Sequence, residues 1–330
     1  MLTRRGLFGL AVVGMLGACA PAGPPGPTPP GGYFSPRPSL SDARAGMDEA
    51  LRLTGLVDAL LARRDLDRLS AGQVNALRWA RAAQAAHIAV LAAADSSPTP
   101  ALPAEPSATP APSTTPSAGS TPGPAPASGW AKLQAALRDV AAADLRRAKA
   151  TLGPTCLLWT SLGAYASAAA RSIASGAAQL VPAPARLTSA AIAQSDALAD
   201  AVRGAHEVVF AFGIALTTFR KHGPGYDPML NALLGWRGWR DQLAELMRSV
   251  NLEPPVAEPF YRVDVPRSQS ASRALCARVE AAYLPHLGRL VASSADTALR
   301  DLAIGKLTST AGSTAGWGGG LHVWPGWPGA

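Results

Sequence analysis

Residues 196–219 read "DALADAVRGAHEVVFAFGIALTTF", and this stretch decides the fold class. Its apolar residues recur at alternating steps of three and four, which at about 100° of rotation per residue places them on one side of a helix. The resulting seam consists of Leu198, Val202, Ala205, Val209, Phe212, Leu216 and Phe219. Ala and Leu also dominate the other periodic segments, and both are good helix formers. We therefore predict an all-α fold.

Working outward from this helix, the periodicity predicts four helices in each half of the chain. Their expected ranges are 41–64, 70–94, 129–152, 154–175, 188–221, 228–250, 269–293 and 294–310. Within each half the helices form tight pairs, and a longer connection separates the second helix from the third. Four-helix bundles with one long crossover have the ferritin-like arrangement. The sequence therefore predicts two tandem ferritin-like bundles over residues 41–180 and 185–316.

The long connections differ in composition from the helices. Residues 95–128 combine Pro, Ala, Ser and Thr with almost no charge, which predicts a disordered loop inside the first bundle. Residues 251–268 are Pro-rich and predict an irregular crossover in the second bundle. The tail 317–330 is rich in Trp, Gly and Pro.

The N-terminus has the pattern of a bacterial lipoprotein signal. Arg4 and Arg5 precede a short apolar run, and "LGAC" at 16–19 resembles a lipobox. We predict a signal peptide over 1–18, lipidation of Cys19 and a disordered Pro-rich tether over 19–40. The protein is then exported and anchored to the outer face of the bacterial cytoplasmic membrane. "TRRGLFG" at 3–9 also resembles a twin-arginine signal, so both export routes stay open.

The net charge is +8, and isolated Arg residues supply most of the positive charge. No basic run of the kind that binds nucleic acid is present, so we expect no nucleic-acid partner. The expected partners are the membrane, through the lipid, and an envelope protein or the cell wall. Cys156 and Cys276 have neither metal-ligand spacing nor a disulfide pattern, and we interpret both as small buried hydrophobes.

Three stretches carry a family resemblance. They are the opening helix at 196–219, the text from Leu246 to Asn251 that leads into the crossover, and the tail "LHVWPGWPGA" at 321–330. Together they resemble a ferritin-like domain of unknown function that occurs in exported actinobacterial proteins. The resemblance covers roughly residues 190–330, and it implies a fold and a question about metal.

Ferritin-like di-iron sites need a Glu from each of two helices and a Glu-x-x-His from each of the other two. In the first half, Gln84 and His87 have the Glu-x-x-His spacing, and Asp144 occupies an inward position on the third helix. This set has too few carboxylates to neutralise two iron ions. We expect His87 to be a buried histidine hydrogen-bonded to Asp144 or Gln84. The alternative is one residual iron or other divalent ion at Gln84, His87 and Asp144.

The opening helix holds a second metal candidate, His206. It lies at the edge of the apolar seam, whereas Glu207 lies on the opposite face, four residues after Arg203. Ala205 stands where the resemblance implies a Glu, so a ligand pair is not expected. Phe210 and Ile214 make this helix apolar on every side, which predicts that it packs between the two bundles or against a partner.

No phosphate loop, nucleophile elbow or zinc-protease motif is present in the sequence, and we name no catalytic residue. Trp324 and Trp327 are predicted either to cover a groove of their own bundle or to stack on cell-wall sugars. Together these features favour a lipid-anchored envelope protein with a binding or scaffolding role. The alternatives are a metal-binding ferritin-like redox protein and a cell-wall glycan binder that uses the Trp-rich tail.

Overall fold

The computed structural model describes residues 33–62, 69–95, 129–176, 180–181, 187, 189–190 and 192–328. In these residues almost all regular structure is α-helix, which confirms the predicted all-α class. The predicted signal peptide, Cys19 and residues 96–128 of the predicted loop 95–128 lie outside the described residues, whereas Asp95 is helical. No helix in the described part of the chain combines the length and apolar character needed to cross a membrane.

The described helices follow the predicted order. They are α1 (Leu40–Leu61), α2 (Ala71–Asp95), α3 (Gly129–Ala150), α4 (Gly153–Ser172), α5 (Gln194–Leu216), α6 (Tyr226–Ser249), α7 (Gln269–Ser293) and α8 (Thr297–Gly316). Three bounds differ clearly from prediction. α5 begins six residues after position 188, because Ser189–Ala190 is extended, and it ends at Leu216 rather than at 221. α8 continues past position 310 to Gly316.

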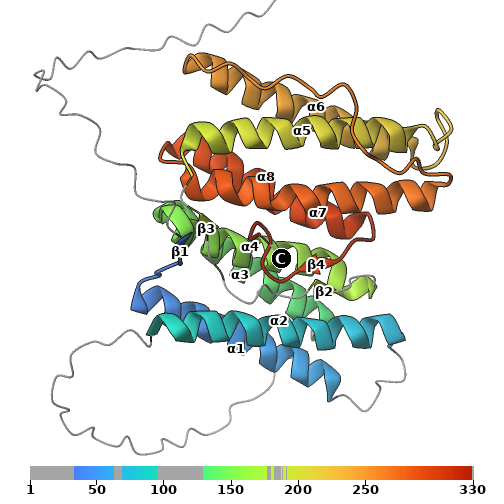
Figure 1. Ribbon diagram of the computed structural model, residues 1–330. Coiled ribbons are helices and arrows are strands. Elements are labelled where there is room, and N and C mark those ends of the chain that lie inside the picture. The colour runs from blue at the N-terminus through green and yellow to red at the C-terminus, as the bar shows by residue number, and fades with distance from the viewer. Residues whose placement is uncertain are drawn as a thin grey trace, which may run out of the picture.

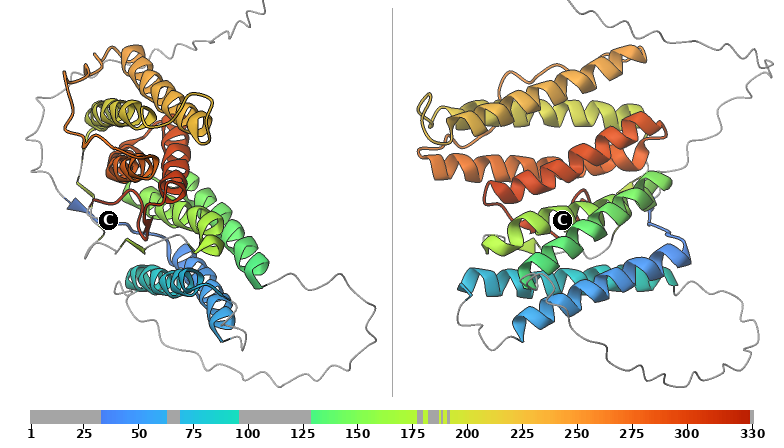
Figure 2. Two further views of the ribbon diagram at one scale, coloured as in Figure 1. Left: turned by 90° about the vertical axis from the view of Figure 1, so that its right-hand side faces the viewer. Right: turned by 180° about the vertical axis from the view of Figure 1, so that it is seen from behind.

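The helices stack in layers of two (Figures 1 and 2). α6 lies at one end with α5, followed by α7 and α8, then α4 and α3, and finally α1 and α2 at the other end. The two halves, α1–α4 and α5–α8, meet where α4 packs against α8 and α7. Each half repeats one contact pattern, in which the first helix packs on the second and third, and the third packs on the fourth.

α4 is the helix that is buried on every side. All residues from Cys156 to Ala166 are buried, as are Ala168, Ala169 and Ala170. The sequence predicted this position between the halves for α5, and that prediction is wrong. α5 packs on α6 and α7, and its outer face is covered by the crossover, where the ring of Tyr261 lies 5.3 Å from the ring of Phe210.

Two short strand pairs join distant parts of the chain. β1 (Tyr33–Phe34) pairs antiparallel with β3 (Ser189–Ala190), so the predicted tether over 19–40 is wrong at its C-terminal end. β2 (Leu180–Val181) pairs in parallel with β4 (Leu321–His322). Because β2 follows α4 and the short 3-10 helix η2 (Ile173–Ser175), this second pair brings the C-terminal tail to the first half.

Candidate functional site

The core of the first half contains one polar void. Gln84 and His87 of α2, Asp144 of α3 and Tyr165 of α4 line it, and all four are buried. Its volume is about 10 Å³, which is the room that one water molecule needs. The Tyr165 hydroxyl has no hydrogen-bond partner among the described residues. The structure thus brings Gln84, His87 and Asp144 to one place, as their helical spacing indicated.

His87 is held by the tail of the chain. Its Nε2–H donates to the carbonyl oxygen of Val323 at 3.0 Å, and its ring lies edge-on to Tyr165 and Trp324 at 4.8 and 4.7 Å. The expected hydrogen bond to Asp144 or Gln84 is therefore wrong. Burial lowers the pKa of His87 to about 4, with the carbonyl bond opposing the shift. The imidazole is neutral at pH 7, and its bonded nitrogen is committed to the backbone.

The guanidinium of Arg147, which was not predicted as a site residue, lies beside the void. Arg147 Nη1 donates to Asp144 Oδ1 at 2.8 Å and to Glu49 Oε2 at 2.7 Å, and Nη2 donates to Glu49 Oε1 at 3.0 Å. The guanidinium carbon lies 5.1 Å from the ring of Trp159. We call Glu49, Asp144 and Arg147 the arginine cluster. The available signal was spacing, because Arg147 follows Asp144 by three residues and so shares its helix face.

The charges of the arginine cluster are arranged around one cation. Burial and the neighbouring Glu49 raise the pKa of Asp144 to about 7, whereas Arg147 lowers it. The pKa of Arg147 is raised, chiefly by its bonds to Glu49. A guanidinium suits this place because its planar fork can bind a carboxylate through two parallel bonds.

These donors do not fit a di-metal centre. Both carboxylates of the cluster bind a permanent cation, and no group of three or more His, Cys, Asp and Glu side chains in the described residues could hold a metal ion. Carboxylate and imidazole ligands need free lone pairs and a net negative charge to bind divalent ions. Arg147 supplies a positive charge at that position instead.

The second half also has a buried polar group, which is formed by side chains of α6, α7 and α8. Glu280 of α7 accepts a hydrogen bond from Trp236 Nε1–H at 3.0 Å and another from the Ser313 hydroxyl. Lys306 Nζ of α8 lies 3.6 Å from the centre of the Trp236 ring, as in a cation–π contact. Glu280 is 2 % exposed.

Burial shifts both charges of this group toward neutrality. It raises the pKa of Glu280, against the hydrogen bonds from Ser313 and Trp236 and the charge of Lys306. It lowers the pKa of Lys306 to about 8, with Glu280 opposing the shift. The side chains of this group fill the space between α6 and α8, which make little direct backbone contact.

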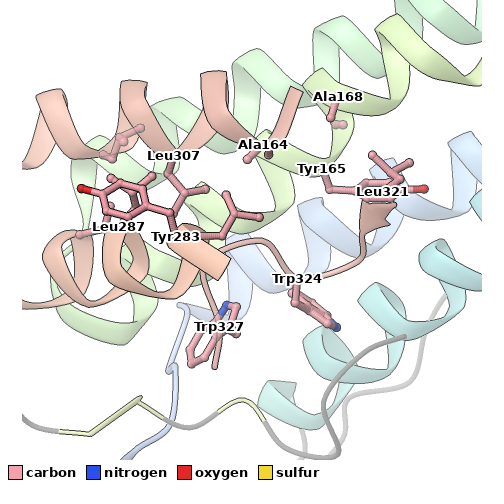
Figure 3. Packing of buried hydrophobic residues seen from close by; sticks show 14 of the residues in the cluster. Ala164, Tyr165, Ala168, Tyr283, Leu287, Leu307, Leu321, Trp324 and Trp327 are labelled. Atoms are coloured by element: carbon pink, nitrogen blue, oxygen red, sulfur yellow. The ribbon is translucent and has the colours of Figure 1, made fainter. Parts of the chain in front are cut away.

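The tail packs against both halves. The ring of Trp324 lies 4.7 Å from the ring of His87 on α2, whereas Gly326 lies against Gly288 of α7 and Leu307 of α8. Trp324 and Trp327 are each 1 % exposed (Figure 3). The Ser161 hydroxyl of α4 donates to the Pro325 carbonyl at 2.8 Å. The predicted cover over a groove of its own bundle leaves out these contacts with the first half. Sugar stacking would need an exposed indole face, which neither residue has.

A known family matches the second half and its tail. Residues 197–329 match the model of a domain of unknown function, DUF4439. A crystal structure of a conserved hypothetical protein from Mycobacterium tuberculosis is similar at 23% identity and a TM-score of 0.35, covering 38% of this chain and 93% of that chain. No curated protein matches the chain. The DUF4439 region thus includes the tail that enters the first half.

The remaining candidates of the DUF4439 region lie at its surface. His206 is half-buried, and its Nε2–H donates to the Pro255 carbonyl of the crossover at 3.2 Å. Burial is the main cause that lowers its pKa. Glu207 is exposed as expected, but the ion pair of Arg203 that the structure records is with Asp200, at 3.5 Å. Ile214 is half-buried, as is Phe210 under the crossover.

Proposed function

We propose that this chain is a lipid-anchored cell-envelope protein whose two ferritin-like bundles serve binding or scaffolding rather than catalysis. In this proposal Cys19 carries the lipid and holds the helical body at the outer face of the cytoplasmic membrane. The lipobox-like "LGAC" and the short apolar run before it support the anchor. The repeated contact pattern of the two halves supports the bundle arrangement.

The main observation that supports a non-catalytic role is the arginine cluster. Arg147 binds both Glu49 and Asp144, which are the acidic side chains beside the polar void. A guanidinium does not release its proton in proteins, so both carboxylates face a permanent positive charge. The cluster joins α1 to α3, and its two carboxylates are held in hydrogen bonds to this cation.

The group around Glu280 supports the same conclusion in the second half. Its carboxylate accepts bonds from an indole and a hydroxyl, and the nearby ammonium of Lys306 lies on an indole ring. Trp236 and the buried Trp239, whose ring centre lies 5.5 Å from Lys306 Nζ, occupy the part of the bundle core where metal-ligating side chains would be needed. We interpret this group as a buried polar bridge between α6, α7 and α8.

One observation favours a second candidate, a metal-binding redox protein. Gln84, His87 and Asp144 line a single void, and a twin-arginine signal would export a folded, metal-loaded chain. In this alternative the metal would displace Arg147 from Asp144. The glycan-binding alternative has less support, because Trp324 and Trp327 are buried.

Two measurements on the native host test the proposal. Radiolabelled palmitate should enter the wild-type chain and leave the Cys19→Ala variant unlabelled and released from the membrane. Elemental analysis of protein purified from membranes should find less than one tenth of an iron per chain. About two irons per chain would overturn the non-catalytic reading, and an unlabelled wild-type chain would overturn the anchor.

A further inference from the structure

A groove lies between α1 and α2. These two helices form the outermost layer of the first half (Figures 1 and 2). Its volume is about 630 Å³, within the range of small-molecule sites in proteins. Its apolar lining comprises Leu61, Val74, Ala82, Ala85 and Ile88. The packing of the fold does not explain this lining, because α2 buries a different face, that of Leu77 and Leu91, against the bundle.

The groove also has positive charge along its lining. Arg78 and Arg81 line it, and Arg81 Nε pairs with Asp58 of α1 at 2.9 Å. Arg78 is exposed and forms no ion pair with any described residue. A guanidinium beside an apolar groove is the arrangement that recognises an amphiphile with an anionic head group. The negative charge of Asp58 next to Arg81 disfavours a head group of charge −2.

The dimensions of the groove favour a single long chain. Val74 and Ile88 are fourteen residues apart on α2, or about 21 Å along the helix axis. An extended long-chain acyl group has a similar length. A groove of this length offers contact along the whole of such a chain.

We propose that the α1–α2 groove binds one long-chain fatty acid, with its carboxylate on Arg78 and its acyl chain along the apolar lining. The inference is independent of the proposed membrane anchor, because it uses only groove residues of the folded body. The proposed class of ligand is a lipid with one acyl chain and one negative charge. Binding is driven by burial of methylene groups, and Arg78 selects for the charge.

Palmitate binding to the full chain carrying Cys19→Ala tests this proposal, because no attached lipid competes in that variant. We expect saturable binding below the micellar concentration of palmitate. Ala85 is exposed and lines the groove, so the indole of Ala85→Trp should occupy the groove and weaken palmitate binding at least tenfold. Arg78→Glu should weaken palmitate binding roughly tenfold and leave binding of uncharged hexadecanol unchanged.

Matched substitutions on α3 are the controls. Ala135→Trp and Arg138→Glu place the same changes on an exposed helix surface outside the groove, and both should leave palmitate affinity unchanged. Circular dichroism checks that each variant is folded. Absence of saturable binding, equal losses in the α3 variants, or equal affinity for hexadecanol and palmitate would each overturn the proposal. A dimer that Ala85→Trp dissociates would assign the groove to a second copy of the chain instead.

Discussion

At the residue scale, the arginine cluster shows how a buried acidic site can be satisfied without metal. Asp144 has 4% of its side chain exposed and Glu49 has 23%. Carboxylates in such places are costly unless a positive charge or hydrogen-bond donors compensate for lost hydration. Arg147 supplies both, and its aliphatic stem and ring contact with Trp159 add packing.

Replacing Arg147 by Met should strongly destabilise the fold. The substitution keeps most of the volume but leaves Asp144 and Glu49 without their cation, and breaking a buried pair in this way costs about 3 kcal/mol. Urea denaturation at pH 7.5 measures the loss in free energy of unfolding. Arg248→Met is the matched control, because the Arg248–Glu245 pair is exposed and should be worth less than about 1 kcal/mol. Equal losses for the two variants would refute the role of the cluster.

His87 should make stability depend on pH. Its pKa is about 4 in the fold, below the ordinary 6.5, so the unfolded chain binds its proton first as the pH falls. Its contribution to stability is therefore complete above pH 6.5 and decreases as the pH falls toward 4. At pH 5 the loss from this residue is about 2 kcal/mol.

Comparison with His87→Gln isolates this contribution from those of other titrating groups. The free energy of unfolding is measured at pH 7.5 and pH 5.0 for both proteins. The variant should lose about 2 kcal/mol less than the wild type over that interval, although it is less stable at pH 7.5. A variant that follows the pH dependence of the wild type would show that His87 does not remain neutral and buried.

The residue-level picture was only partly predictable from sequence. Helical periodicity indicated that Gln84 and His87 share the inward face of one helix and that Asp144 lies on the inward face of another. All three line the same void. Their partners were not predictable: Val323 is 236 residues from His87, and Glu49 is 98 from Arg147. Contacts of that separation depend on tertiary packing, which local periodicity does not encode.

At the element scale, α4 rather than α5 is the helix that is buried on every side. A helix that is apolar on all sides is buried on all sides, and "CLLWTSLGAYASAAA" at 156–170 satisfies this rule better than α5 does. Its small residues let α3, α7 and α8 approach closely. The outer face of α5 is instead covered by the crossover, through Tyr261 and the Pro255 carbonyl.

The contact between α7 and the tail depends on a glycine. A Cβ atom at Gly288 would lie 1.8 Å from the Gly326 carbonyl oxygen, and Gly326 itself has a φ of +96°. Gly288→Ala should therefore displace the tail and cost about 2–3 kcal/mol of stability. Gly305→Ala is the control, because open space surrounds that position on α8, and there alanine should add about 0.5–1 kcal/mol. Thermal unfolding of both variants measures the difference, and a gain for Gly288→Ala would contradict the close packing.

At the scale of the whole molecule, the tail makes the two halves interdependent. Besides the α4 contacts with α7 and α8, the tail is bonded to His87 of α2 through the Val323 carbonyl and to Ser161 of α4 through the Pro325 carbonyl. The helices and their order were predictable, because each element carries its own periodicity. The position of the tail was not, because a two-residue parallel pairing between β2 and β4 has no local sequence signal.

The most direct test of this interdependence is hydrogen exchange in the Trp324→Ala variant. If the tail completes the first half, the substitution in the C-terminal tail should speed amide exchange in α2 and α4 at least tenfold more than in α6. Trp239→Ala removes a buried indole from the second half. It should speed amide exchange in α6 more than in α2 and α4. Faster exchange confined to α7 and α8 in Trp324→Ala, with α2 unchanged, would contradict the account.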